Sequence, residues 1–300
     1  MTDYKKEEKG VNKEEEKTER ELEREEEDKE FIPVIVKRTD ESLRHPDDIL
    51  DKIISEGLEQ LNRPFTSLFL SAMAAGLILG FTAMSVAVIE SQTISLIKSE
   101  ASRLSMALVY PLGFVLCIMS GTQLFTEHTA TAVYPVLDRR SKIKPLFRLW
   151  VIVIIGNLLG AIISSSFLVA TDKVIAAKSG YIAIGLHLIK YDSGVLFLSA
   201  VLAGWLMALG AWLVMATQPA FSQMLSIYVV TFIIGIGGLH HSIAGSVEIF
   251  TAYLISDLFS IQQVLRFLIL AIFGNLVGGS IFVALLNYGH IRETQKSTHD

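Results

Sequence analysis

The sequence predicts an all-α membrane protein with six transmembrane helices arranged as an inverted repeat of three plus three. Three observations predict it: an uneven charge distribution, six long apolar stretches and an internal repeat. Of the 31 acidic residues, 18 lie in the first 50 positions together with 11 of the 26 basic residues, whereas 51% of the 300-residue chain is hydrophobic. The rest of the chain therefore carries too little charge for a water-exposed surface, which is typical of a helical bundle solvated by lipid.

Two segments are expected ahead of the bundle. The stretch from Lys5 to Glu30 is nearly all Glu, Lys and Arg, which cannot bury enough apolar surface to fold alone, so residues 1–45 are predicted to be a disordered cytoplasmic tail. This tail lacks the apolar segment of a signal peptide. In residues 46–64, apolar side chains recur at helical spacing and predict an amphipathic helix along the cytoplasmic membrane surface.

Six apolar stretches are long enough to cross a hydrocarbon layer of about 30 Å. They begin near Thr66, Ser105, Leu146, Gly194, Gln223 and Val264. They predict a transmembrane pore domain over residues 65–290 and a short C-terminal tail over 291–300. The loop from Asp138 to Lys144 has four basic residues and one acid, so the positive-inside rule places it, and with it both termini, on the cytoplasmic side of the plasma or inner membrane.

The internal repeat relates spans 1–3 to spans 4–6. Span 1 opens with the motif Leu-Phe-Leu-Ser-Ala at Leu68, and span 4 opens with the same motif at Leu196. The residues that recur 118 positions apart are Arg148, Gly156, Asn157, Leu158 and Gly160 in span 3, and Arg266, Gly274, Asn275, Leu276 and Gly278 in span 6. Because three is an odd number, the second copy enters the membrane from the opposite face, and such repeats hold a solute site near the midplane between the halves.

We expect the repeated glycines to allow close packing of helix backbones. We expect Asn157 and Asn275 to form hydrogen bonds between helices.

Spans 2 and 5 are expected to be broken. Span 2 is interrupted from Gly121 to Thr129, and a short apolar piece resumes at Ala132. Span 5 is interrupted from Gly235 to Ser242. Polar side chains and unwound backbone at membrane depth are tolerated only inside the protein, so two breaks at matching places predict a translocation site.

The broken segments and the Gly-Asn-Leu-x-Gly signatures of spans 3 and 6 resemble those of the formate/nitrite transporter family. The segments concerned are Leu124-Phe125-Thr126 within 121–129 and Leu239-His240-His241-Ser242-Ile243-Ala244. The resemblance covers about residues 64–290. Two further stretches, Gln123 to Glu127 and Gly245 to Glu248, are similar to the YfdC-type branch of the family. The resemblance implies an aquaporin-like protomer, a homopentamer and one pore per protomer.

The resemblance also implies a site for a small solute. Thr126 would lie beside a hydrophobic constriction at Phe125, and a buried histidine, His241, would face it. Leu239, with Tyr228 and Phe232, is a further candidate for the constriction. Because an imidazole can donate a hydrogen bond or a proton to a carboxylate, a weak acid could cross the apolar constriction as a neutral molecule. The predicted function is a channel or transporter for small monovalent solutes of the formate and nitrite type, with proton involvement of His241.

Two acids favour an alternative solute. Glu127 and Glu248 would repel anions if they were ionised and faced the pore, so the solute could instead be an amine, ammonium or a neutral molecule. Alternatively the two acids pair with His128, His240 or His241 and leave a neutral network. A structural role and a pore-lining role stay open for each acid.

Two further classes of function receive less support. The adjacent His240 and His241, with the acids, could hold the metal of a membrane enzyme, but the chain has no H-E-x-x-H helix, no G-x-S-x-G elbow and no phosphate-binding loop. A non-conducting sensor or scaffold could act through the charged tail. We therefore predict no enzyme, no metal, no cofactor and no nucleic-acid partner, but a protein surrounded by a lipid bilayer.

Overall fold

The computed structural model describes residues 45–93 and 99–297, with side chains for 45–93 and 101–293. The predicted charged tail lies outside the described residues except for His45. Within the described ranges every regular element is a helix.

Six helical segments of the described chain are long and apolar enough to cross a membrane. They are Phe65–Thr93, Ala101–Met119, Ile143–Ala170, Ser193–Ala216, Ala220–Gly237 and Ile261–Glu293. Each predicted span begins within a few residues of the first residue of one of these segments. The prediction of an all-α membrane protein with six spans is confirmed, because the described residues form helices and six of the helical segments have the length and apolarity that a span needs.

Several spans are built from more than one helix. Span 1 comprises α4 (Phe65–Ile78) and α5 (Gly80–Thr93), and span 2 comprises α6 (Ser99–Val109) and α7 (Pro111–Met119). Spans 3, 4 and 5 are α10 (Ile143–Ala170), α13 (Ser193–Ala216) and α14 (Ala220–Gly237). Span 6 comprises α16 (Ile261–Val277), the π-helical η2 (Gly278–Leu285) and α17 (Leu286–Ser297), so the predicted C-terminal tail begins within a helix.

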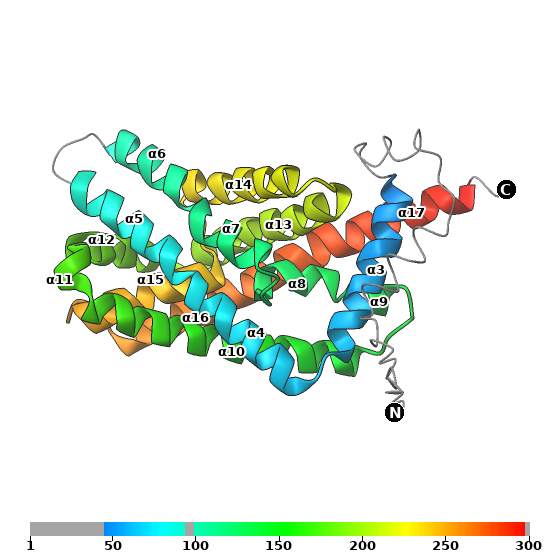
Figure 1. The fold of residues 1–300 in the computed structure, drawn as a ribbon, viewed down its shortest axis with the longest axis horizontal. Coiled ribbons are helices and arrows are strands. Elements are labelled where there is room, and N and C mark those ends of the chain that lie inside the picture. Colours follow the sequence, from blue (N-terminus) through cyan, green and yellow to red (C-terminus); the bar gives the residue numbers. More distant parts are fainter. Residues whose placement is uncertain (1–44, 94–98, 298–300) are drawn as a thin grey trace, which may run out of the picture. The chain divides into compact units, whose positions relative to one another are not determined.

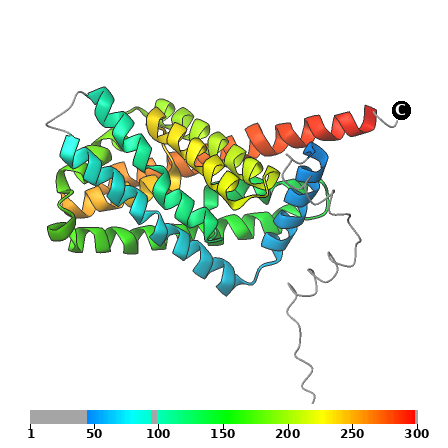
Figure 2. The ribbon, with the colours of Figure 1, turned by 45° about the horizontal axis from the view of Figure 1, so that its top comes forward.

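Shorter helices connect the spans or follow the breaks. They are α3 (Pro46–Asn62), α8 (Phe125–Thr131), α9 (Tyr134–Leu137), α11 (Asp172–Ile175), α12 (Lys178–Ile189) and α15 (Ser242–Ile255). Figures 1 and 2 show α3 and α17 together at one end of the helices, while α11 and α12 lie at the opposite end.

The two halves use the same close contacts. Helix α4 packs against α10, and α13 packs against α16. A Cβ added at Gly76 on α4 would collide with the carbonyl oxygen of Asn157, and one added at Gly204 on α13 would collide with that of Asn275. Because the same positions of the two copies touch the same partners, the inverted repeat seen in the sequence is a repeat of packing as well.

Spans 2 and 5 are both broken, as predicted, but the breaks are shorter than predicted. The helix after the first break restarts at Phe125 and not at Ala132, so the prediction that unwound chain extends to Thr129 was wrong. Span 5 stays helical to Gly237, and helix resumes at Ser242. The preceding helices end where Gly121 and Gly238 adopt the left-handed conformation, with φ of 68° and 60°. Glycine reaches this conformation without strain and therefore terminates a helix sharply.

The amphipathic helix α3 buries its apolar side chains against the protein. These side chains are Ile49, Leu50, Ile53, Ile54 and Leu61. Helix α3 contacts α8, α9, α10 and α13, and at Gly57 there is no room for a Cβ beside Pro135. Its apolar face is thus covered by protein, and its predicted position along a membrane surface stays a prediction.

Candidate functional site

The first break is held by the side chain of Asn157. Its Oδ1 accepts a hydrogen bond from the backbone N–H of Phe125 at 2.9 Å. Its Nδ2 donates to the carbonyl oxygens of Ala72 at 2.7 Å and Gln123 at 2.9 Å. A single buried amide therefore links span 1, the unwound segment and the start of α8, and it satisfies backbone groups that would otherwise be unpaired inside the membrane.

The second break is held in the same way by Asn275. Its Oδ1 accepts from the backbone N–H of Ser242 at 2.7 Å, and its Nδ2 donates to the carbonyl oxygens of Ala200 at 2.7 Å and His240 at 3.1 Å. The two asparagines are not only packing residues between helices, because each also fixes the backbone of its break. We call these two arrangements the asparagine clamps.

A serine from spans 1 and 4 completes each clamp. The hydroxyl oxygen of Ser71 accepts from the N–H of Gln123 at 3.1 Å, and that of Ser199 accepts from the N–H of His240 at 3.2 Å. Both serines belong to the repeated motif that opens these spans. The breaks are therefore stabilised by residues of all three helices in each half.

One hydrogen bond joins the two breaks to each other. Nε2 of His241, at the N-terminus of α15, lies 2.7 Å from Oγ1 of Thr126 on α8. Only 1% of His241 and 2% of Thr126 is exposed. Nδ1 of His241 accepts from the backbone N–H of Ala244 at 3.1 Å. A neutral ring that accepts at Nδ1 carries its proton on Nε2, so this tautomer donates from Nε2 to the threonine hydroxyl.

An aromatic ring packs against the histidine of this hydrogen bond. The rings of Phe114 and His241 are nearly perpendicular, with centroids 4.9 Å apart and an interplanar angle of 86°. Phe125 is buried beside Thr126 in the sequence. The structure does not bring Tyr228 into this group, because its hydroxyl donates to the carbonyl of Leu108 and its ring stacks on Phe232.

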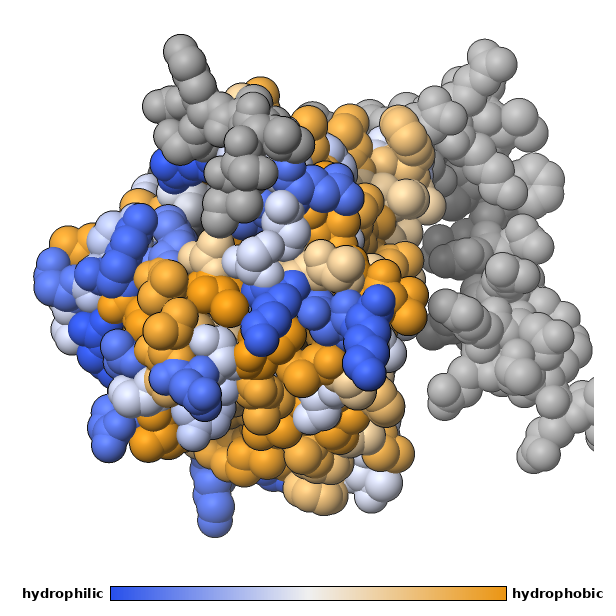
Figure 3. Space-filling model, turned by 90° about the vertical axis from the view of Figure 1, so that its left-hand side faces the viewer, coloured by the Kyte–Doolittle hydropathy of each residue, from blue (hydrophilic) through white to orange (hydrophobic). Residues whose placement is uncertain are grey.

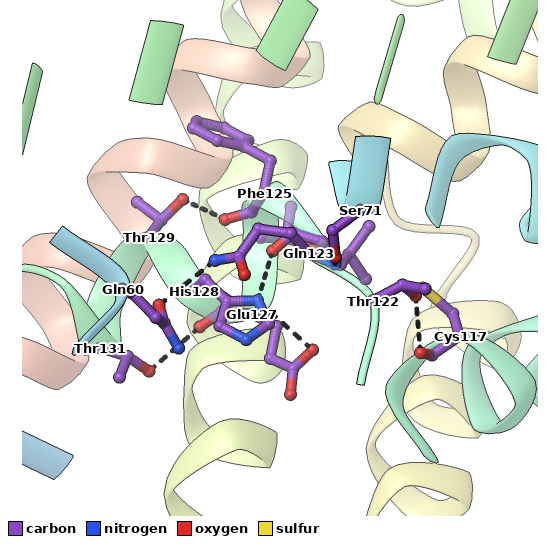
Figure 4. A network of polar contacts seen from close by, with 12 residues as sticks. Gln60, Ser71, Cys117, Thr122, Gln123, Phe125, Glu127, His128, Thr129 and Thr131 are labelled. Atoms are coloured by element: carbon purple, nitrogen blue, oxygen red, sulfur yellow. Dashed lines mark hydrogen bonds and ion pairs between the residues drawn. The ribbon is translucent and has the colours of Figure 1, made fainter. Parts of the chain in front are cut away.

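Glu127 and His128 are neighbours on α8, the helix that follows the first break. Its Oε2 is 3.7 Å from Nδ1 of His128, which is also 3.1 Å from the carbonyl oxygen of Leu124. Figure 4 shows Glu127 and His128 within the polar network around Gln123. Only 8% of Glu127 is exposed, and its buried Oε2 accepts no hydrogen bond from the described residues, so the contact with His128 is a long one.

A chain of polar contacts that the sequence analysis missed ties α3 to the first break. Gln123 accepts a hydrogen bond from Arg63 at 2.9 Å. It donates one to Oε1 of Gln60 at 3.2 Å (Figure 4). Gln60 in turn donates to Glu56 at 3.1 Å. The available signal was that Gln60 lies in line with the apolar face of α3, next to Leu61, where a polar residue needs a buried partner.

The second break opens onto a cavity of about 880 Å³, which we call the α12 cavity. Many of the residues that line the cavity come from helix α12 and from the residues directly after it. Others come from α5, α6, α14, α15 and α16. Glu248 and Leu239 line it, whereas Thr126, Glu127 and His241 do not. Figure 3 views the end at which α11 and α12 lie and shows hydrophilic side chains scattered among hydrophobic ones.

His187 on α12 is a site residue that the sequence analysis missed. Its Nε2 lies 3.2 Å from the carbonyl oxygen of Gly238 in the break, and its ring is parallel to that of His240, with centroids 6.0 Å apart. Burial lowers the pKa of His187, the charges of Lys190 and Arg103 lower it further, and the bond to Gly238 and the charge of Glu90 only partly oppose this. His187 is therefore neutral at pH 7. The signal in the sequence that could have identified this residue is a histidine between two leucines in a short apolar helix.

His240 makes a contact of its own at the second break. Its Nδ1 lies 2.8 Å from the hydroxyl of Ser199, and its ring also meets that of Tyr191. Within the part of the chain that the structure describes, no three His, Cys, Asp or Glu side chains gather at metal-binding distances.

Comparison with known proteins places this chain in a family. The family described as "Formate/nitrite transporter" matches residues 47–289. The inner membrane protein YfdC of Escherichia coli (strain K12) is 31% identical over 247 residues, which cover 81% of this chain and 78% of that protein. A probable formate transporter of Methanothermobacter thermautotrophicus is 28% identical over 203 residues, covering 62% of this chain and 74% of that one.

Solved structures share the fold. A structure described as "FNT family ion channel" superposes with a TM-score of 0.73 at 20% identity and covers 81% of this chain and 99% of its own. A structure described as "Pentameric formate channel with formate bound" gives a TM-score of 0.62 at 22% identity, covering 75% and 96%. Both superpositions show that this chain shares the fold of these channels. With a family match that extends over most of the sequence, this chain belongs to the formate/nitrite transporter family, a family of transport proteins and not of enzymes.

Proposed function

We propose that this chain conducts small monovalent anions of the formate and nitrite type across the inner membrane, through one pore in each protomer of a homopentamer, with both termini cytoplasmic. The observation that supports the proposal best is the hydrogen bond between His241 and Thr126, which connects the two broken helices at a buried position. The names of the relatives, an inner membrane protein, a probable formate transporter and a pentameric formate channel, support the location, the solute and the assembly.

The chemistry of the pair suits a carboxylate. Moving an anion out of water costs several kcal/mol unless donors replace its hydration. The Nε2–H of His241 is such a donor, and an arriving carboxylate oxygen can take the place of the Thr126 hydroxyl as its acceptor. Hydrogen bonds to charged groups contribute about 1.5–3 kcal/mol each, so one such bond offsets part of the desolvation cost.

The tautomer of His241 limits how a proton could be supplied. Because Nδ1 accepts from Ala244, the neutral ring donates a hydrogen bond but has only one proton. Transfer of that proton to a solute would require a second proton on Nδ1, which would break the bond to Ala244. Since that second proton must come from solution, we expect proton-linked uptake to increase as the pH falls.

A second candidate function rests on Glu248. This acid lines the α12 cavity and has no ion pair among the described residues, whereas Glu127 lies 3.7 Å from His128. An unpaired carboxyl beside the route favours a small amine or ammonium as the solute.

One uptake experiment separates the two candidates. Full-length protein in liposomes would be assayed for formate and methylammonium uptake at about pH 5.5 and about pH 7.5, on either side of the usual histidine pKa. His241→Ala and the Glu127→Gln/Glu248→Gln pair would be compared with wild type, and His290→Ala, an exposed histidine on α17, is the matched control.

The outcomes differ clearly. Formate uptake that rises at the lower pH and falls at least about tenfold in His241→Ala, which corresponds to the loss of one charged hydrogen bond, supports the anion proposal. Methylammonium uptake that requires the two glutamates supports the second candidate. Uptake of neither solute contradicts both.

A further inference from the structure

The α12 cavity is lined by two basic and two acidic side chains. The basic residues are Arg103 and Lys190, and the acidic ones are Glu90 and Glu248. At a volume of about 880 Å³, the cavity has room for a solute of several heavy atoms together with bound water. Their formal charges sum to zero, so the cavity as a whole favours neither anions nor cations.

The positive end lies where α12 meets the second break. A Cβ added at Gly238 would be 3.1 Å from a terminal nitrogen of Arg103 and 3.2 Å from Nε2 of His187. Arg103 and Lys190 both act electrostatically on His187. The guanidinium of Arg103 therefore lies directly over the glycine that ends α14.

The negative end lies on α15. Glu248 is only 6% exposed and interacts electrostatically with Tyr110, which also lines the cavity. Glu90, the other acid, acts electrostatically on His187 together with Arg103 and Lys190, so Glu248 is the acidic lining residue that α15 contributes.

Two of the four charged groups are already engaged with neighbours. Oε2 of Glu90 accepts a hydrogen bond from Ser102 at 2.7 Å, and the ammonium of Lys190 lies 4.9 Å above the ring centre of Tyr191. For Arg103 and Glu248, the described side chains provide no ion pair and no hydrogen bond. Glu248 is buried, whereas Arg103 is exposed. A buried charge without a partner is costly, so the carboxyl of Glu248 gains most from a ligand of opposite charge, and the guanidinium of Arg103 is accessible to the other end of such a ligand.

We propose that the α12 cavity binds a small zwitterion of the amino-acid class, with its carboxylate on Arg103 and its ammonium group beside Glu248. A carboxylate accepts two parallel hydrogen bonds from a guanidinium, and a nearby ammonium group stabilises the ionised form of a buried carboxyl. An ion with a single charge would satisfy one end only and leave the other group unpaired. This binding does not depend on which solute crosses the constriction at His241 and Thr126.

Binding can be measured by isothermal titration calorimetry on the full-length protein in detergent. The probes are glycine, β-alanine and 4-aminobutanoate, which separate the two charges by increasing lengths, and propionate and propylamine, which each lack one charge. We expect at least one amino acid to bind wild type about tenfold or more tightly than either single-charge analogue, because each end contributes a charged hydrogen bond.

Two variants test the assignment of the ends. Arg103→Met and Glu248→Gln should each weaken amino-acid binding about tenfold or more. Glu248→Gln should at the same time bind propionate more tightly than wild type does, and Arg103→Met should bind propylamine more tightly. A misfolded protein cannot gain affinity, so these gains distinguish a local effect from loss of structure. Lys178→Met, which removes an exposed cation of α12 outside the cavity lining, is the matched control and should leave binding unchanged.

Three outcomes would overturn the proposal. Wild type that prefers propionate to every amino acid has an anion site, and wild type that prefers propylamine has a cation site. Wild type that binds none of the five probes has no such site. Because no step of this experiment measures flux, a failure to transport formate leaves its result unaffected.

Discussion

The breaks in spans 2 and 5 have the same backbone arrangement but different surroundings. Each follows a left-handed glycine, Gly121 or Gly238, and each is held by an asparagine clamp. The first break is covered by α3, through the contacts of Gln123, whereas the second opens onto the α12 cavity. The comparison teaches that the repeat determines where the chain unwinds, while non-equivalent residues outside the repeated motifs determine what each break can contact.

The largest expected effect tests whether the clamps are equivalent. Asn157→Leu and Asn275→Leu each remove three hydrogen bonds and leave buried backbone groups unpaired, so each should lower the free energy of unfolding by about 3 kcal/mol or more. Thermal unfolding in detergent would measure this as a lower Tm. Asn62→Leu, at an exposed asparagine, is the control. A large loss at one clamp and none at the other would show that the two breaks are held differently.

A smaller effect on stability should distinguish substitutions at the two left-handed glycines. Gly121→Ala has free space around the added Cβ, so only the left-handed backbone conformation opposes it, at about 1 kcal/mol. Gly238→Ala carries the same strain and also displaces Arg103 and His187, which lie 3.1 and 3.2 Å from the new Cβ. We expect a lower Tm for Gly238→Ala than for Gly121→Ala. Equal Tm values would mean that the surroundings of the second break move without cost.

A third variant concerns only the covered break. Gln60→Leu keeps the apolar face of α3 but removes the contacts to Gln123 and Glu56, which should cost about 1 kcal/mol. It should also make the backbone of residues 120–124 exchange amide hydrogen faster, while that of 238–241 is unchanged. Faster exchange at both breaks would contradict the view that α3 stabilises only the first.

The smallest effect is a pH dependence in the loop that follows the first break. Partial burial alone would raise the pKa of Asp138, but hydrogen bonds from Arg292 and Tyr288 and the charges of Arg292 and Arg140 outweigh it and hold this pKa below its ordinary value. A lowered pKa in the folded state stabilises the protein above the ordinary value, about 3.9, and this stabilisation is lost as the pH falls through the lowered pKa.

The measurement is the Tm difference between wild type and Asp138→Asn. It should be positive near pH 6 and should decrease as the pH falls below about 3.9. Asp257→Asn, at an exposed acid in the equivalent loop after the second break, should show no such trend. A difference for Asp138→Asn that is constant over this pH range would contradict the assigned ion pairs.

The sequence was sufficient to predict the parts of the structure that depend on local composition and on repetition. Span positions follow from apolar length, and the pairing of halves follows from residues that recur at a fixed spacing. The length of the breaks was wrong because helix α8 restarts where Asn157, from another span, binds the N–H of Phe125. No local pattern around Phe125 contains that information.

The candidate site was only partly predictable for the same reason. His241 and Thr126 lie in the breaks themselves and could be named from the sequence, and the structure places them 2.7 Å apart. His187, Arg103 and Gln60 reach the breaks from α12, α6 and α3, so their position depends on tertiary packing. A polar residue on an apolar helical face indicates that a buried partner exists, but it does not identify that partner.

The asparagine clamps have a consequence for the origin of the chain. Each clamp is formed entirely within one half, by Asn157 with spans 1 and 2 or by Asn275 with spans 4 and 5. A single three-helix polypeptide inserted in both directions would therefore form both clamps in an antiparallel dimer of identical subunits. The two halves of the present chain differ in charge: the loop at 138–144 has four basic residues, while its counterpart at 256–260 has one acid and no basic residue. Two copies joined in one chain can differ in this way, so each half can carry a topology signal and a chemistry of its own.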